Sequence, residues 1–331
     1  MKILIAGLGS IGRRHLHNLL ALGESDILLY RTHHSTLPDE ELAGFPVETD
    51  LAVALAYRPV AVIVSNPTAL HLQVAIPAAE AGCHLLLEKP ISHTMEGVDR
   101  LQKAVRRGGG QVLTGFQFRF HPGLQTVRRL LNEGAIGRPL SVRAHWGEHL
   151  PGWHPWEDYR LGYSARADLG GGVVLTLCHS LDYLRWLIGE VAALWAFSDK
   201  LSDLELQVED TAEIGLRFTS KAIGSLHLDF NQRPPAHHLE IIGTQGIIRW
   251  DNGDGAVHAY RSASENWDIY QAPEGFTRND LFQAQLRHFL AVAHGESAPL
   301  CTLEDGVRAL QLALAVHESQ QAGQLIHFRP G

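Results

Sequence analysis

The sequence predicts an α/β protein: an N-terminal Rossmann doubly wound parallel sheet, followed by a C-terminal α/β domain with a large, mostly antiparallel open sheet. Its 331 residues are about twice the usual length of one domain. Residues 1–120 alternate short apolar runs with helical patterns, which is typical of parallel strands joined by helices. From Arg138 onward the apolar segments alternate with polar residues, which is typical of antiparallel strands. We therefore expect one domain over residues 1–120 and a second over residues 121–331.

Composition excludes several classes of protein. The chain is 45% hydrophobic and 19% charged, which is typical of a folded globular protein. Its 28 basic and 36 acidic residues give a net charge of −8, so the cationic face that binds nucleic acid is not expected. No apolar run reaches the ~18–20 residues of a membrane span, and the N-terminus lacks the features of a signal peptide. The three cysteines cannot form a disulfide framework. We expect a cytoplasmic protein that binds neither nucleic acid nor membrane.

The first domain is predicted to contain five buried parallel strands and the helices between them. The strands are expected at residues 2–6, 27–31, 60–65, 84–87 and 111–115. The helices are expected from the first glycine motif to about Leu22, then at 50–56, 70–81 and 95–107. Asp50 is the expected N-cap of the second helix, and the glycines at 108–110 are expected to end the last one.

The second domain is predicted to be a sheet with helices on one face. Strands are expected at residues 140–149, 205–218, 222–230, 237–243 and 246–250, with a turn at Asn252-Gly253-Asp254-Gly255. The covering helices are expected at 122–133, 172–188, 280–294 and 302–322.

The segment Gly7-Leu8-Gly9-Ser10-Ile11-Gly12 follows the first strand and opens the first helix, the context in which a GxGxxG motif indicates dinucleotide binding. Gly7 makes the tight turn, Gly9 lets the backbone approach a pyrophosphate, and Gly12 allows close packing of helix on strand. The amides of Ser10 and Ile11 at the helix N-terminus then face the phosphates. A purely structural glycine turn is the alternative.

The second predicted strand ends at Tyr30-Arg31-Thr32, where recognition of a ribose 2′-hydroxyl normally requires a carboxylate. None is present. Arg31 is instead suited to a 2′-phosphate, with the hydroxyl of Thr32 or Ser35 beside it, so the sequence favours NADP over NAD. The alternative is that Arg31 is a solvated loop residue that stacks on adenine.

Two further strands end in polar residues at the edge where open parallel sheets bind ligands. Ser65-Asn66-Pro67-Thr68 and His71 follow the third strand, and Glu88-Lys89-Pro90 follows the fourth. A lysine is usually a solvated surface charge, but one held at this edge by a proline is a candidate for function.

These motifs resemble those of the glucose–fructose oxidoreductase/inositol dehydrogenase/rhizopine-catabolism (Gfo/Idh/MocA) family of sugar-acting oxidoreductases. The matching segments are GLGSIG, SNPTALH at 65–71, EKP at 88–90, GFQFRFHP at 115–122 and GGGVVLTLCHSLDYLRWLIG at 170–189. The resemblance implies a nicotinamide cofactor, a substrate bound between the domains, and a homodimer or homotetramer formed through the C-terminal sheet.

The resemblance also implies roles for single residues. Gly7, Gly9 and Gly12 would hold the pyrophosphate, Asn66, Pro67 and His71 would line the cofactor, and Glu88 would orient the lysine segment or contact the nicotinamide ribose. Lys89 would be the catalytic acid/base, with Pro90 as the family's cis-proline, and His179 the catalytic histidine. Arg119 lies in the matched GFQFRFHP segment and is a candidate substrate contact.

One position departs from the family. An aspartate commonly precedes the catalytic histidine by one helical turn, and here that position is Thr176, or Leu175 if the shortening is placed differently. Neither side chain accepts a proton. Thr176, His179 and Asp182 would share one face of the predicted helix, where Asp182 is placed to orient the imidazole. A satisfied core histidine is the alternative for His179.

The segment 149–163 (HLPGWHPWEDYRLGY) has no helical or strand periodicity and is rich in aromatic and charged residues. Aromatic faces beside hydrogen-bonding groups suit a sugar ring. Trp153, His154, Trp156 and Arg160 are therefore candidate substrate contacts, with a structural interface plug as the alternative. No metal site is expected, because the 20 histidines show no metal-ligand spacing.

Three functions remain open from the sequence. The first is an NAD(P)-dependent dehydrogenase or reductase in which Lys89, assisted by His179, exchanges a proton with a secondary alcohol or ketone of a sugar or polyol. The second is a glycoside-cleaving or epimerising enzyme that oxidises its substrate transiently, with no net redox change. The third is a non-catalytic nicotinamide-sensing protein.

Overall fold

The computed structural model describes residues 1–32 and 40–328 and divides the chain into two compact units. Unit 1 comprises residues 1–117, 168–170 and 278–310, and unit 2 comprises residues 118–167, 171–277 and 311–331. The first change of unit lies close to the boundary expected at residue 120. The return of residues 278–310 to unit 1 is not visible in the sequence.

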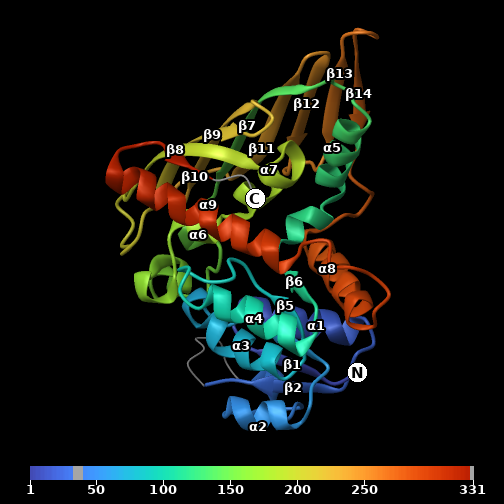
Figure 1. Ribbon diagram of the computed structural model, residues 1–331, viewed down its shortest axis with the longest axis vertical. Coiled ribbons are helices and arrows are strands. Elements are labelled where there is room, and N and C mark those ends of the chain that lie inside the picture. Colours follow the sequence, from blue (N-terminus) through green and yellow to red (C-terminus); the bar gives the residue numbers. More distant parts are fainter. Residues whose placement is uncertain (33–39, 329–331) are drawn as a thin grey trace. The chain divides into compact units, whose positions relative to one another are not determined.

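Unit 1 is built on a six-stranded parallel sheet with the strand order β3-β2-β1-β4-β5-β6 (Figure 1). The strands are β1 Ile3–Ala6, β2 Ile27–Tyr30, β3 Val47–Glu48, β4 Ala61–Val64, β5 His84–Leu87 and β6 Val112–Thr114. This is the order of a doubly wound dinucleotide-binding sheet. All five predicted strands form, and the side chains of β1 and β4 are wholly buried, as their unbroken apolar runs require. The additional strand β3 is two residues long, too short to leave a pattern.

The helices of unit 1 largely follow the predictions. They are α1 Ser10–Ala21, α2 Leu51–Ala56, α3 His71–Glu80, α4 Val98–Gly108 and α8 Arg278–Ala293. Asp50 caps α2, as predicted, because its carboxylate accepts hydrogen bonds from the N–H groups of Ala52 and Val53. Helix α4 begins at Val98 rather than Met95. It ends at Gly108, and the next residue, Gly109, caps it with a φ of 79°.

Helix α8 corrects one prediction. It was expected to cover the second sheet, but it belongs to unit 1 and packs against α1. The Phe282 ring of α8 lies edge-on to the His15 ring of α1, with 6.3 Å between centroids. The periodicity of apolar residues shows that α8 buries one face. It does not show which sheet or helix that face packs against.

Unit 2 is built on a nine-stranded sheet with the order β14-β13-β12-β11-β7-β10-β9-β8-β15. Its strands are β7 Pro139–Gly147, β8 Val191–Asp199, β9 Thr211–Phe218, β10 Ile223–Asp229, β11 Ala236–Gly243, β12 Gly246–Asp251, β13 Val257–Arg261, β14 Asn266–Tyr270 and β15 Ile326–His327. Neighbours pair antiparallel except β7 and β10, which run parallel. The predicted mostly antiparallel sheet is confirmed. The prediction missed β8, β13, β14 and the two-residue β15, and it began β9 too early, at residue 205.

Helices cover one face of this sheet (Figure 1). Helix α5 (Pro122–Asn132) contacts β12 and β13, α6 (Val173–Thr176) contacts β9 and β10, and α7 (His179–Ile188) contacts β7. The single helix predicted over 172–188 is therefore wrong in one respect, since Leu177 and Cys178 separate α6 from α7. Helix α9 (Leu303–Ala322) begins in unit 1 and ends in unit 2.

The other face of the sheet in unit 2 carries exposed side chains. Trp195, Phe197 and Ile223 are 38%, 61% and 59% exposed, respectively. We call this surface the open face. Among the described residues, no helix combines the length and apolar character that a membrane crossing requires.

Candidate active site

The three glycines of the motif have different surroundings: Gly7 and Gly12 are closely packed, whereas Gly9 faces open space. Gly7 has a φ of 94°, and a Cβ there would overlap the backbone of Asn66. A Cβ on Gly12 would overlap the Gly7 carbonyl oxygen, whereas a Cβ on Gly9 would meet nothing within 4 Å. The amides that begin a helix lack carbonyl partners within that helix. The open side at Gly9, next to the first amides of α1, therefore fits a pyrophosphate.

The segment that follows β4 is hydrogen-bonded to the loop between β1 and α1. The Ser65 hydroxyl lies 2.9 Å from the Gly7 carbonyl oxygen and 3.1 Å from that of Ala6. The Asn66 amide donates a hydrogen bond of 2.9 Å to the Leu70 carbonyl oxygen. Its side-chain oxygen Oδ1 is buried and accepts no hydrogen bond from the described part of the chain. A buried acceptor of this kind fits a site that a polar ligand completes.

His71 connects two segments of the predicted site. Its Nδ1 lies 2.8 Å from the Pro90 carbonyl oxygen and its Nε2 lies 2.9 Å from the Asn66 carbonyl oxygen. Burial lowers the pKa of His71 to about 4, so the imidazole is neutral at pH 7. The neutral ring has one N–H and therefore donates to one of these two carbonyl oxygens, while the other nitrogen only lies beside its carbonyl.

The EKP segment lies at the carboxyl end of β5. Glu88 Oε1 lies 2.8 Å from His15 Nε2, and both side chains are buried. Burial alone would raise the pKa of Glu88, but the hydrogen bond from His15 and the nearby charges of His15 and Lys89 hold it below its usual value. The backbone N–H of Lys89 donates to Glu88 Oε2 at 3.3 Å. Lys89 is half-buried, and the Lys89–Pro90 peptide bond is cis, as the resemblance implies.

His15 is a residue of this site that the sequence analysis did not single out. It lies on α1, far from Glu88 in the sequence, and it is fully buried. A histidine inside an amphipathic helix carries no local signal of its partner.

Arg31 and Thr32 follow β2, as expected. Arg31 is 7% exposed, and its backbone N–H donates to the Glu48 carbonyl oxygen at 3.1 Å. Thr32 is exposed, and Ser35 lies outside the described residues.

In unit 2, His179 begins α7 and is buried in a cluster of rings. The Phe118 ring lies 5.3 Å from the His179 ring, and the Trp146 ring lies 5.7 Å from it. Trp146 also stacks on His237 at 4.1 Å, with an interplanar angle of 5°. The Tyr183 hydroxyl is 3.2 Å from His237 Nε2. Phe118 and Trp146 thus place the imidazole of His179 in an aromatic setting.

Arg119 and Asp182 form a buried ion pair, a pairing that the sequence analysis did not predict. Arg119 Nε donates to Asp182 Oδ2 at 2.9 Å, and Nη2 donates to Oδ1 at 2.7 Å. The two side chains are 3% and 1% exposed. The pair links the segment before α5 to α7, whose first residue is His179.

The end of α6 places Thr176 where the family commonly has an aspartate. Thr176 is buried, and its backbone N–H donates to the Gly172 carbonyl oxygen at 2.9 Å. At the other end of α6, Glu209 accepts a hydrogen bond of 3.1 Å from the Val174 N–H. A Cβ on Gly172 would overlap this carboxylate, so the glycine makes room for it.

The aromatic segment 149–163 forms short 3₁₀ turns over Leu150–Gly152 and Tyr159–Leu161. Trp153 packs edge-on against Phe230 at 5.4 Å, and Trp156 is 70% exposed, with the His154 ring 5.4 Å away. Arg160 is exposed and bonds the carboxylates of Asp158 and Glu205. Trp153 therefore has a packing role, whereas Trp156 presents its ring to solvent.

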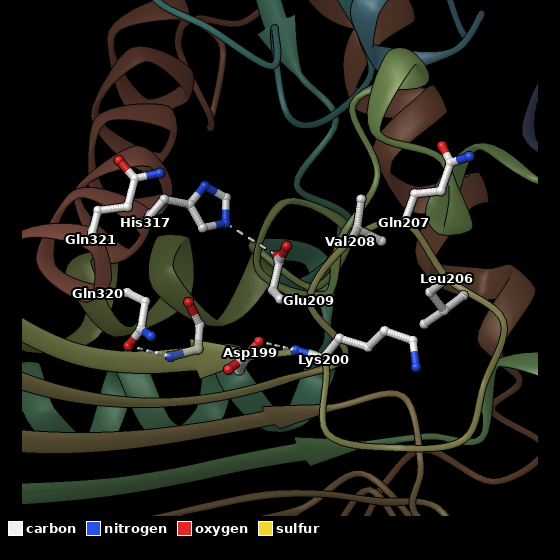
Figure 2. Close-up of a pocket in the computed structure, with 10 residues that line it drawn as sticks. Asp199, Lys200, Leu206, Gln207, Val208, Glu209, His317, Gln320 and Gln321 are labelled. Carbon is white, nitrogen blue, oxygen red and sulfur yellow. Dashed lines mark hydrogen bonds and ion pairs between the residues drawn. The ribbon is translucent and has the colours of Figure 1, made fainter.

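Unit 2 also contains an open pocket of about 510 Å³ (Figure 2). Its lining includes Lys200, Glu209 and His317, and His317 Nε2 lies 3.2 Å from Glu209 Oε1. None of the predicted site residues lines this pocket.

A Rossmann unit with an open glycine loop and a lysine at the end of β5, joined to an α/β unit, defines the class of the nicotinamide-dependent oxidoreductases. Residues 1–116 match the family model described as an oxidoreductase family with an NAD-binding Rossmann fold. Residues 124–249 match the model of the GFO/IDH/MocA C-terminal domain. The chain belongs to the Gfo/Idh/MocA family and is an NAD(P)-dependent oxidoreductase.

Individual relatives agree with this assignment. The chain is 30% identical over 282 residues to 1,5-anhydro-D-fructose reductase of Ensifer adhaerens, covering 82% of this chain and 80% of that protein. It is 27% identical over 339 residues to myo-inositol 2-dehydrogenase of Thermotoga maritima, covering 96% of each chain. A solved structure of levoglucosan dehydrogenase in complex with NADH and levoglucosan has the same fold, with a TM-score of 0.87, 21% identity and full coverage of both chains.

Proposed function

We propose that the protein transfers a hydride between a nicotinamide cofactor and a secondary alcohol or ketone of a sugar, an inositol or a sugar derivative. The observation that carries the proposal is the place of Lys89, held at the carboxyl end of β5 between Glu88 and the cis bond to Pro90. The relatives named as a reductase of an anhydro sugar and a dehydrogenase of an inositol support the substrate class.

The chain's own residues would divide the work as follows. When bound, the nicotinamide ring supplies the hydride acceptor or donor. Lys89 Nζ takes the proton from the substrate hydroxyl during oxidation and returns it during reduction. His179 assists by positioning the hydroxyl or relaying its proton, and Trp153, His154, Trp156, Arg119, Arg160 and Thr176 stay candidate substrate contacts.

The decisive experiment replaces Lys89 by methionine, which keeps the length of the side chain and removes its proton chemistry. We expect kcat on a panel of sugars and polyols to fall by about 10²- to 10⁴-fold. The affinity for NADH and the melting temperature should stay close to those of the parent protein. The matched control is Lys103→Met on α4, an exposed lysine paired with Asp99, which should leave kcat unchanged.

The role of His179 is tested by combining a substitution of His179 with the substitution of Lys89. Residues that act on the same proton give effects that are far from additive. We expect the Lys89→Met/His179→Gln double variant to be little slower than Lys89→Met alone. Near-normal turnover by Lys89→Met would overturn the assignment of the acid/base.

The same assays separate the other functions that the sequence leaves open. A dehydrogenase consumes the cofactor in proportion to product. Product formed with a catalytic amount of cofactor would indicate transient oxidation, as in an epimerising or glycoside-cleaving enzyme. Cofactor binding without turnover of any sugar or polyol would indicate a sensing protein.

We infer a preference for NADP over NAD from Arg31. It is buried where β2 ends, and Tyr30-Arg31-Thr32 offers no carboxylate for a ribose 2′-hydroxyl. Arg31→Met should weaken NADPH binding at least about 10-fold and leave NADH binding nearly unchanged, since a charge-assisted hydrogen bond contributes roughly 1.5–3 kcal/mol. Equal losses for both cofactors, measured by fluorescence titration, would contradict the preference.

We also propose that the protein forms a homodimer or homotetramer through the open face. Trp195 and Phe197 pack against each other at 4.3 Å, and both are exposed at one end of that face. Phe197→Asp should shift the mass measured by light scattering toward the monomer while the circular dichroism spectrum is unchanged. An unchanged mass would mean that another surface joins the copies.

A further inference from the structure

The open face carries a row of ionisable side chains across five adjacent strands. Register pairs Glu213 of β9 with His227 of β10, and His227 with His145 of β7. It then pairs His145 with His238 of β11, and His238 with Asp251 of β12. The rings of His227 and His145 stack at 4.6 Å, and those of His145 and His238 stack at 5.1 Å. Three imidazoles thus lie side by side between two carboxylates.

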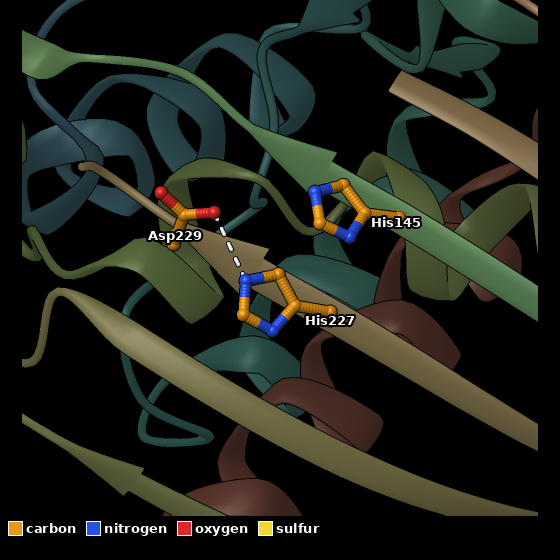
Figure 3. Close-up of side chains that lie close together, drawn as sticks. All are labelled: His145, His227 and Asp229. Atoms are coloured by element: carbon orange, nitrogen blue, oxygen red, sulfur yellow. Dashed lines mark hydrogen bonds and ion pairs between the residues drawn. The ribbon is translucent and has the colours of Figure 1, made fainter. Parts of the chain in front are cut away.

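One part of this row gathers groups that bind metal ions. His145, His227 and Asp229 each offer one ligand atom, and these atoms all lie within 4.8 Å of one another (Figure 3). His227 Nε2 is 2.9 Å from Asp229 Oδ2. Asp229 is buried, and the two histidines are half-buried. Zinc ligands lie about 2.0–2.2 Å from the ion, so small side-chain rotations bring all three atoms to one centre.

Hydrogen bonds from neighbouring groups orient the proposed ligands, as such bonds commonly do around metal ions. Glu213 Oε1 lies 2.6 Å from His227 Nδ1, which keeps a proton on that nitrogen. Nε2, which lies 2.9 Å from Asp229 Oδ2 and donates to it in the metal-free protein, is then the nitrogen that an ion would take by displacing its proton. Asp229 Oδ1 accepts the backbone N–H groups of Asn231 and Gln232, both at 2.7 Å, which fixes the carboxylate.

Because Gly147 has no side chain, the Asp229 carboxylate can lie directly beside it. It pairs with Asp229 in register, and a Cβ on Gly147 would overlap Asp229 Oδ2 and the Gln232 side-chain oxygen. The same Gln232 oxygen accepts a hydrogen bond from His145 Nε2. An ion at this point would find a further oxygen donor in Gln232 or in water.

We propose that His145, His227 and Asp229 bind a divalent transition-metal ion such as Zn²⁺ on the open face of unit 2. Two imidazole nitrogens and one carboxylate oxygen are a donor set that suits zinc and its neighbours and not Mg²⁺ or Ca²⁺. The ion links β7 to β10 where both strands end, just before the aromatic segment 149–163. No metal site is expected from the sequence, because these ligands are far apart in the chain. The parallel pairing of β7 with β10 brings them together.

The experiment is a titration of untagged, chelator-treated full-length protein with Zn²⁺ and, separately, with Co²⁺. We expect one tight equivalent of Zn²⁺ by calorimetry, an increase in melting temperature, and visible Co²⁺ absorption bands typical of nitrogen and oxygen ligands. His145→Gln should weaken the tight site by about 30-fold or more, and Glu213→Gln by about 10-fold, as is usual for partners of metal ligands.

The matched control is His238→Gln. His238 lies in the same row and stacks on His145, but it is outside the ligand set, so its loss should leave the tight site intact. Gly147→Ala should weaken the site without removing any ligand, because its Cβ displaces the Asp229 carboxylate. Equal losses in His145→Gln and His238→Gln, or the same weak Zn²⁺ binding in the parent protein and His145→Gln, would overturn the proposal.

Discussion

At the scale of single residues, Arg119 and Asp182 form an ion pair that is buried inside unit 2. Both side chains are nearly inaccessible, and two hydrogen bonds join them. Removing one member leaves an unpaired buried charge, which costs about 3–5 kcal/mol. Arg119→Met should lower the free energy of unfolding by that amount in urea. Arg160→Met breaks exposed ion pairs instead and should leave the free energy of unfolding unchanged, so equal losses would contradict the prediction.

Two buried histidines make stability depend on pH. Burial lowers the pKa of His71 and of His121 to about 4, against an ordinary value of 6.5. Between pH 6.5 and 4 the unfolded chain binds protons that the folded chain does not, so the free energy of unfolding falls as the pH falls.

His121→Asn isolates one of these contributions. His121 Nδ1 accepts the Gly123 N–H at 3.0 Å at the start of α5, and asparagine can replace it as a helix cap. Since one pKa unit corresponds to about 1.4 kcal/mol, the variant should gain about 2 kcal/mol relative to the parent between pH 7 and pH 5. Urea unfolding at both pH values checks this, and parallel pH profiles for the two proteins would contradict it.

The sequence placed the residues of the predicted site more reliably than their partners. Glu88 and Lys89 were expected at a strand end and lie there, because a short apolar run bounded by polar residues marks both ends of a buried strand. The contacts of His15 with Glu88 and of Arg119 with Asp182 could not be predicted. Each contact joins segments that are far apart in the sequence and meet only in the folded chain. The position of a histidine or an arginine in the sequence does not show which residue it will contact.

At the scale of elements, the loop between β1 and α1 separates glycines needed for folding from one needed for binding. A Cβ on Gly12 would overlap the Gly7 carbonyl oxygen, so Gly12→Ala should lower the melting temperature. Gly9 has a φ of −71° and open space around it, so Gly9→Ala should fold normally. The methyl group would occupy the approach to the helix amides, and we expect NADH and NADPH to bind at least about 10-fold more weakly. Unchanged cofactor affinity in Gly9→Ala would contradict this use of the loop.

The secondary structure that the sequence missed has physical reasons. Residues 191–197 of β8 are all apolar, although Trp195 and Phe197 are exposed, so its sequence lacks the alternation of apolar and polar residues that identifies a strand. Strand β14 is five residues long and exposed along most of its length. Its sequence alternates Trp267 and Ile269 with Asn266 and Asp268, but so short a run is a weak signal of a strand. The break between α6 and α7 falls in an apolar stretch without glycine or proline, where no residue marks it.

At the scale of the whole molecule, unit 1 is assembled from distant parts of the chain. Helix α8 buries Leu281, Phe282, Leu286 and Phe289 in that unit, each 3% exposed or less. A fragment of residues 1–120 lacks these side chains and exposes the surface of α1 that α8 covers. We expect this fragment to aggregate or to show little protection from amide hydrogen exchange.

A matched fragment tests this directly. Residues 1–120 joined by a flexible linker to residues 278–310 restore the α8 contacts and should give a monomeric, protected fragment that binds NADH. Equal behaviour of the two fragments would mean that the sheet of unit 1 is stable without α8.

This discontinuity affects the order in which the protein is completed during synthesis. The glycine loop leaves the ribosome first, yet the layer that buries one side of its helix is translated only after nearly all of unit 2. The nascent cofactor domain must therefore stay partly open while the second sheet is made. A stop codon after residue 277 would remove none of the predicted cofactor contacts and would still deprive the chain of a finished cofactor domain.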